Sequence, residues 1–169
     1  SIANQMVETD KISLDKAVEM YAKTGMAMSD AAVAIWGNKY KYNVRRPIEY
    51  IREIIDPEWK TILNNPYSNI TGLTPEFPAY PSGHSGFGSS ASLILTDAFG
   101  DNRTFTDNCH QDRHEFIGTP RTFTSFIEAG LEDAYSRIRL GVHYRMDCDE
   151  GVRLGYLAAT RVLNLPWYK

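Results

Sequence analysis

Residues 136–147 combine three residue types that could serve a single reactive site. They place Arg137, His143 and Asp147 in this order along the chain. Arginine is a permanent cation whose planar set of donors suits a tetrahedral oxyanion. Histidine can act as a nucleophile or a metal ligand, and a carboxylate one helical turn away can hold its other ring nitrogen. Taken alone, the stretch is better explained as a basic helix end with a structural histidine.

Two more cations occur at a suggestive place in the first third of the chain. Lys39 is followed, after six residues, by Arg46 and Pro47. A proline in this position favours an extended residue before it and a new helix after it. Together with Arg137, these two side chains could surround a tetrahedral oxyanion on three sides.

A third segment, Pro81-Ser82-Gly83-His84, contributes a hydroxyl, a glycine and a second imidazole. Gly83 would let the backbone approach a ligand closely, and Ser82 would add a donor. A helix that begins here would offer free N–H groups and the positive end of its dipole. We predict His143 as the nucleophile or ligand, with Asp147 behind it, and His84 as an acid or base on the opposite side.

The spacing of apolar residues predicts an all-α fold, a helical bundle with long loops. We expect helices over residues 10–36, with a break near Ser29-Asp30, and over residues 47–55 and 123–139. A further helix should open at residues 82–84 and run to 99, and a last one should end at 163. Residues 56–81 contain five prolines and predict a long functional loop.

Composition sets outer limits on function. The 169 residues suffice for one domain, and the net charge of −3 gives no support for nucleic-acid binding. No apolar run approaches the roughly 20 residues that span a bilayer, and no signal peptide is evident. Cys109 and Cys148 lack metal-site spacing, and we favour a disulfide between them, since Cys109 lies in a polar loop. The pair His110 and His114 has no third ligand nearby, so we do not predict a metal site there.

The combined motifs resemble the signature shared by type 2 phosphatidic acid phosphatases, bacterial class A acid phosphatases and vanadium-dependent haloperoxidases. All positions of that signature match, from Lys39 to Asp147. The resemblance implies that a pocket binds the oxygens of vanadate or phosphate. His143 would be the vanadium ligand or the phosphate acceptor, oriented by Asp147, and His84 would be the acid or base. The residues expected to bind the oxygens are Lys39, Arg46, Ser82, Gly83 and Arg137.

The segment Phe77-Pro78-Ala79-Tyr80 before Pro81 looks like the fungal chloroperoxidase type of the haloperoxidase branch. There Phe77 corresponds to an aromatic residue near the halide. We therefore expect a haloperoxidase that oxidises halide with hydrogen peroxide at a His-bound vanadate, with Lys39 polarising the peroxide. The alternative is a metal-free acid phosphatase that acts on a phosphate ester through phospho-His143. The membrane phosphatase branch is disfavoured, and a non-catalytic anion-binding domain ranks last.

Haloperoxidases of this type are usually much longer than this chain. We therefore expect residues 1–169 to form a single helical domain, the C-terminal catalytic part of a longer protein. Missing helices or a homodimer partner could complete the pocket wall. We expect the protein to be exported, to the periplasm or the extracellular space.

Overall fold

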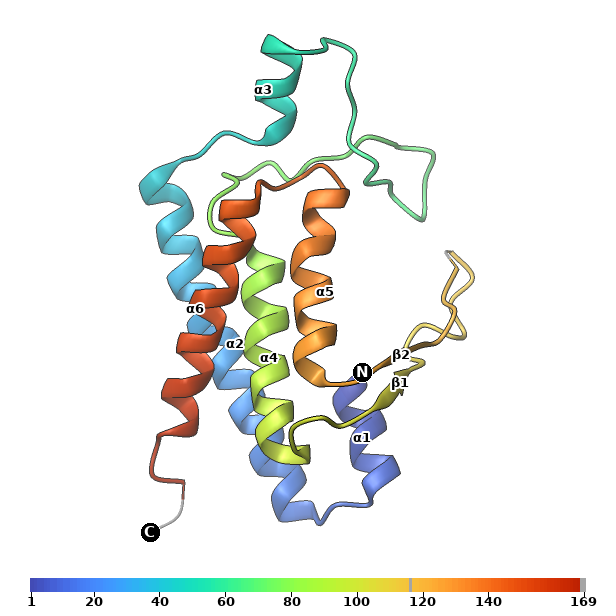
Figure 1. Ribbon diagram of the computed structural model, residues 1–169, viewed down its shortest axis with the longest axis vertical. Helices are drawn as coiled ribbons and strands as arrows, with labels where there is room; N and C mark the ends of the chain where they lie inside the picture. Colours follow the sequence, from blue (N-terminus) through green and yellow to red (C-terminus); the bar gives the residue numbers. More distant parts are fainter. Residues whose placement is uncertain (116, 168–169) are drawn as a thin grey trace.

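The computed structural model describes residues 1–115 and 117–167 and is mostly helical (Figure 1). A small antiparallel hairpin joins the fourth and fifth helices and pairs Phe105 with Phe123. The predicted all-α bundle with long loops is therefore confirmed, although the hairpin was not predicted. In chain order the elements are α1 (Ile2–Asp10), α2 (Leu14–Tyr42), α3 (Pro47–Ile54), α4 (Gly83–Phe99), β1 (Phe105–Asp107), β2 (Arg121–Phe123), α5 (Phe126–Arg139) and α6 (Arg145–Leu163).

Helix α4 is the centre of the bundle and packs against α2, α5 and α6 (Figure 1). Small residues allow this close packing. A Cβ atom on Gly86 would lie 3.3 Å from the backbone oxygen of Gly151 in α6, and one on Gly130 in α5 would lie 2.9 Å from the oxygen of Gly88. Because backbones approach so closely, the residues carried by the ends of these helices are held in fixed positions.

An aromatic cluster closes one end of the bundle, at the hairpin. The rings of Phe105 and Phe126 stack with centroids 4.7 Å apart, and Phe99 and Phe123 pack beside them. Phe126 is only 2% exposed. The hairpin strands are three residues long, too short for an alternating pattern to be recognised in the sequence.

Helix α2 differs from the prediction at both its start and its middle. Asp10 ends α1 rather than opening a long helix, and α2 begins at Leu14 after the N-cap Ser13. The expected break at Ser29-Asp30 is wrong, because α2 continues without interruption to Tyr42. Both residues are exposed, so their polar side chains can be solvated without disturbing the helix.

The predicted disulfide is also wrong. Cys109 and Cys148 are both free thiols. Cys148 is fully buried within α6, whereas Cys109 follows the strand β1 and is half-buried. The polar sequence around Cys109 did not show that its thiol is sheltered by the fold. Among the helices of the described residues, none is long and apolar enough to cross a lipid bilayer.

Candidate oxyanion site

All the predicted site residues lie at the end of the bundle opposite the aromatic cluster, where five helices begin or end (Figure 1). Lys39 is in the last turn of α2 and Arg46 is the N-cap of α3. Arg137 is in the last turn of α5, and Asp147 is in the first turn of α6. The segments far apart in the sequence therefore meet because their helix ends meet.

His143 lies just before α6 and is 5% exposed. Its Nδ1 is 3.0 Å from Asp147 Oδ2, and its Nε2 is 3.1 Å from Arg46 Nη1. An arginine can only donate hydrogen bonds, so Nε2 must be the acceptor and Nδ1 must carry the proton that Asp147 accepts. The contacts thus assign the tautomer, and they leave the nucleophilic lone pair of the ring on Nε2.

Asp147 is fully buried and holds more than the imidazole. Its Oδ2 also accepts a hydrogen bond of 2.9 Å from the Tyr144 backbone N–H, which is the capping box of α6. Its backbone oxygen accepts from the Ser82 N–H at 2.8 Å. One residue therefore ties His143 to the start of α6 and to the start of α4.

Arg46 is held by protein atoms on two sides. Its Nε donates to the Phe77 carbonyl at 2.8 Å and its Nη1 donates to the Val142 carbonyl at 2.7 Å. Its Nη2 is buried without a partner in the described structure. Burial, and the nearby charge of Arg137, lower the pKa of Arg46 to about 10, partly opposed by Asp147. The guanidinium remains charged at neutral pH, and one nitrogen is available to a ligand.

Lys39 is fully buried, which is rare for a lysine. Its Nζ donates to the carbonyls of Pro78 and Ala79 at 2.8 and 3.0 Å. Burial, followed by repulsion from Arg46, lowers its pKa to about 7. An anion arriving nearby would raise that pKa again and draw the ammonium into its full charge.

Ser82 is the N-cap of α4, and its side chain accepts a hydrogen bond from the Ser85 N–H. The N–H groups of Gly83 and His84 precede the first intrahelical bond of α4, which starts at Gly86. They are therefore free to face an anion. His84 is exposed, unlike His143. Partial desolvation of the ring, followed by the positive charges of Arg137, Arg46 and Lys39, lowers the pKa of His84 to about 4. The ring is therefore neutral at pH 7.

Arg137 is the third cation and is 8% exposed. Its Nε is buried and has no partner in the described structure. Burial lowers its pKa, while Asp133 raises it in part. Buried donors without partners are costly and are uncommon in folded proteins. Two such donors, on Arg137 and Arg46, would be satisfied by a negatively charged group bound between them.

The balance of charge supports an oxyanion. Lys39, Arg46 and Arg137 bring three cationic groups together, Asp147 is the carboxylate among them, and Asp133 acts on Arg137 from one helical turn away. Burial, opposed by the Asp147 hydrogen bond, holds the pKa of His143 at about 4, so the ring adds no positive charge at neutral pH. A tetrahedral oxyanion such as vanadate or phosphate would satisfy the free donors and offset the surplus charge. The residues present fit such a group.

An aromatic wall borders the cations, and one of its members was missed from the sequence. The Phe77 ring lies 5.2 Å from Lys39 Nζ and 5.1 Å from the Arg46 guanidinium carbon. Trp36 lies 5.6 Å from Phe77 and packs on Gly83, where a Cβ atom would be 3.1 Å from the indole. Its position three residues before Lys39, on the same face of α2, is the signal that could have identified it.

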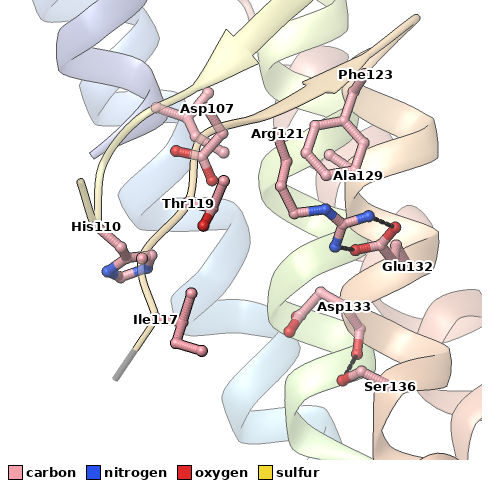
Figure 2. A pocket seen from close by; sticks show the side chains of 12 residues that line it. Asp107, His110, Ile117, Thr119, Arg121, Phe123, Ala129, Glu132, Asp133 and Ser136 are labelled. Carbon is pink, nitrogen blue, oxygen red and sulfur yellow. Dashed lines mark hydrogen bonds and ion pairs between the residues drawn. The ribbon is translucent and has the colours of Figure 1, made fainter. Parts of the chain in front are cut away.

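Other candidate groups remain outside the site. Within residues 1–115 and 117–167, no cluster of three or more histidine, cysteine, aspartate or glutamate side chains could hold a metal ion. A cavity beside the hairpin is lined by His110 but by none of the predicted site residues (Figure 2). The oxyanion site is therefore described by its convergent donors: the guanidiniums of Arg46 and Arg137 and the N–H groups at the start of α4.

Comparison with known proteins identifies related domains. A family model described as the VCPO second helical-bundle domain matches residues 19–165. Vanadium chloroperoxidase of Curvularia inaequalis is 29% identical over 76% of this chain and 27% of that protein. Vanadium-dependent bromoperoxidase of Ascophyllum nodosum is 29% identical over 59% of this chain and 21% of that protein. The chain thus spans about a quarter of the length of these relatives.

Solved structures give the same result. A crystal structure of a bacterial vanadium-dependent iodoperoxidase is 36% identical, with a TM-score of 0.85, over 96% of this chain and 36% of that one. The holo form of a bacterial vanadium-dependent chloroperoxidase has a TM-score of 0.73 over 95% of this chain and 38% of that one. At 17% identity, the second structure is a likeness of fold alone.

Proposed function

This chain belongs to the VCPO second helical-bundle domain family, and from that membership we propose that it carries the vanadate site of a halide-oxidising peroxidase. The observation that carries the proposal is His143, whose Nε2 is an obligate acceptor 3.1 Å from Arg46 and whose Nδ1 is held by Asp147. Beside it, Arg46 and Arg137 each keep a buried donor without a partner. This combination fits one oxyanion bound through one imidazole.

Several residues would contact that anion, each through a different group. His143 Nε2 would be the protein ligand, and Arg46 and Arg137 would donate to its oxygens, with the N–H groups at the start of α4. Lys39 would add charge where it is needed, because its pKa of about 7 allows it to gain a proton as the anion binds. Vanadate, when bound, supplies a Lewis-acidic centre that activates hydrogen peroxide toward a halide.

His84 is the group we propose for proton transfer. It is exposed and stands at the first turn of α4, and its pKa of about 4 keeps the ring neutral at pH 7. A neutral imidazole can accept a proton from hydrogen peroxide as this substrate enters. Phe77 offers an apolar surface next to Lys39 and Arg46, which suits a halide because the anion would meet both positive charge and a water-poor wall.

The decisive experiment measures halogenation of a dye by the protein with vanadate, hydrogen peroxide and bromide or chloride. His143→Ala should lower the rate by about a thousandfold or more, since the ligand atom is lost. His114→Ala is the matched control, because this exposed histidine lies in the loop after β1, and its rate should not change. Absence of halogenation by the wild-type protein at saturating vanadate would reject the proposal.

A second candidate, an acid phosphatase, is favoured by the same Nε2 lone pair of His143, which accepts from Arg46 Nη1 in this structure. His143 Nε2 could attack phosphorus, and the free donors of Arg46 and Arg137 would hold the phosphate oxygens. This enzyme would hydrolyse a chromogenic phosphate ester without vanadate, and vanadate would inhibit it. Running both assays side by side, with and without vanadate, separates the two functions: efficient ester hydrolysis without any halogenation replaces the first proposal with the second.

A further inference from the structure

A tight turn at Gly141 joins the end of α5 to the oxyanion site. Gly141 has a φ of 79°, a backbone conformation that favours glycine. Its N–H donates to the Ile138 carbonyl at 2.9 Å, and the N–H of the next residue, Val142, donates to the Arg137 carbonyl at 3.2 Å. His143 follows directly. The path of this turn therefore fixes where the chain leaves Arg137 and where it presents His143.

The indole ring of Trp59 lies directly on this turn. A Cβ atom on Gly141 would be 2.6 Å from the indole Cη2 and 3.0 Å from Cζ2, so the ring packs against the bare α-carbon with no space between them. Trp59 is half-buried, whereas residues 52–58 before it and Lys60 after it are exposed. The segment after α3 therefore directs one large side chain inwards, onto the turn that precedes His143.

Two hydrogen bonds fix the backbone of this segment. Arg52 Nε, in the last turn of α3, donates to the Trp59 carbonyl at 2.8 Å. On the other side, the Ile62 N–H donates to the carbonyl of Leu140, the residue before Gly141, at 3.2 Å. The backbone that carries Trp59 is therefore attached to α3 at one side and to the Gly141 turn at the other.

These contacts form a closed ring that returns to the oxyanion site. Helix α3 stands beyond the ends of α5 and α6 (Figure 1), with Arg46 as its N-cap and Arg52 in its last turn. From Arg52 the contacts run through Trp59 to Gly141. The carbonyl of the next residue, Val142, accepts the 2.7 Å hydrogen bond from Arg46 Nη1, which closes the ring. A displacement of the turn would therefore act on Arg46 as well.

We propose that Trp59 is a positioning residue, which orients His143 by holding the Gly141 turn. The Val142 carbonyl and His143 Nε2 share one partner, Arg46 Nη1, at 2.7 and 3.1 Å. With the turn held, both acceptors keep their places beside the guanidinium, and the Nη2 of Arg46 stays available to an oxyanion. The orientation of His143 exists without a ligand, whereas its effect on oxyanion binding rests on the proposed function.

The orientation of His143 can be measured in the ligand-free protein. Its Nδ1 proton, which Asp147 accepts, should give a downfield proton NMR signal that disappears in His143→Gln. Trp59→Ala should speed the exchange of this proton with water about tenfold, because a looser turn exposes the imidazole more often. Trp59→Phe, with a smaller ring, should fall between the wild type and Trp59→Ala. Trp167→Ala is the matched control, because it removes a half-buried indole beyond the end of α6 and should leave the exchange rate unchanged.

A double variant tests the contact itself. Gly141→Ala should speed the exchange more than Trp59→Ala, since its methyl group both meets the indole and is strained at this φ. In Trp59→Ala/Gly141→Ala the collision is absent, so the two effects should combine to less than their product. If Trp59→Ala does not fold, Arg52→Ala, which removes the hydrogen bond to the Trp59 carbonyl, provides the same comparison with Gly141→Ala.

Oxyanion binding then shows what the orientation serves. The dissociation constant of vanadate, and of phosphate as a second probe, should rise about tenfold in Trp59→Ala and stay unchanged in Trp167→Ala. Equal proton exchange in the wild type and Trp59→Ala, or equal acceleration in Trp59→Ala and Trp167→Ala, would overturn the proposal. Trp59-dependent exchange in a wild type that binds neither anion would support the positioning role and reject the proposed function.

Discussion

The α4–α5 pair carries an aromatic cluster at one end and an oxyanion site at the other. At the hairpin end, Phe126 is 2% exposed and stacks on Phe105, so the apolar surface is fully used in packing. At the other end, Arg46 and Arg137 are also buried, at 3% and 8% exposed, yet in the described structure they keep donors without partners. Burial stabilises the first end and costs stability at the second.

This difference separates the parts of the bundle that hold the fold from those that serve a ligand. Phe126 is buried at the aromatic end, and Lys39, Arg46 and Arg137 are buried at the site end, where burial of charge is unfavourable. Substitutions at the aromatic end should therefore mainly lower stability, whereas substitutions at the site end should mainly lower ligand binding and activity.

The largest expected effect is at the aromatic end. Phe126→Ala should lower the free energy of unfolding by about 3–5 kcal/mol, because a fully buried ring is replaced by a cavity. Urea denaturation measures this change, with Leu14→Ala as a control, since Leu14 is 80% exposed and its loss should cost little. Vanadate affinity per folded molecule should stay the same. A large fall in that affinity would show that the two ends are not separable.

The second prediction concerns acid stability at the site end. Burial holds the pKa of His143 at about 4, below its ordinary value of 6.5, so the unfolded chain binds more protons between these values. Stability should therefore fall as the pH falls from 6.5 towards 4, by about 3 kcal/mol from this residue. Denaturation curves at pH 7 and pH 4 for the wild type and His143→Gln measure it. The variant should be less acid-sensitive; equal sensitivity would contradict the argument.

The smallest of the three effects is expected at Asp147. Asp147→Asn keeps an oxygen at the Oδ2 position for His143 and Tyr144 but removes the charge. Vanadate affinity, measured by calorimetry, should fall about 10–100-fold, as is usual for partners that orient a ligand. Asp149→Asn removes the same charge from the exposed side of α6 and should leave the affinity unchanged. Similar losses in both variants would mean that net charge, rather than orientation, is what Asp147 provides.

Much of the fold followed from local signals in the chain. Pro47, the N-cap residue Ser82 and the 3.6-residue apolar pattern located the starts and extents of α3, α4, α5 and α6 to within a few residues. The break at Ser29-Asp30 was predicted wrongly because a polar pair can end a helix or lie on its exposed face, and only packing distinguishes these cases. The hairpin was not predicted because its two paired strands are separated by a long loop in the sequence.

The sequence by itself determined which residue types this site contains, since oxyanion binding requires cations, free N–H groups and an oriented imidazole, and these could be recognised by type and order. Only the tertiary structure decided the state of each atom: the tautomer of His143, the free donors of Arg46 and Arg137, and the contact of Trp36 with Gly83. It also separated Cys109 from Cys148 as two free thiols. The physical reason is that hydrogen-bond partners and burial arise between helices that are distant in the sequence, so no local pattern records them.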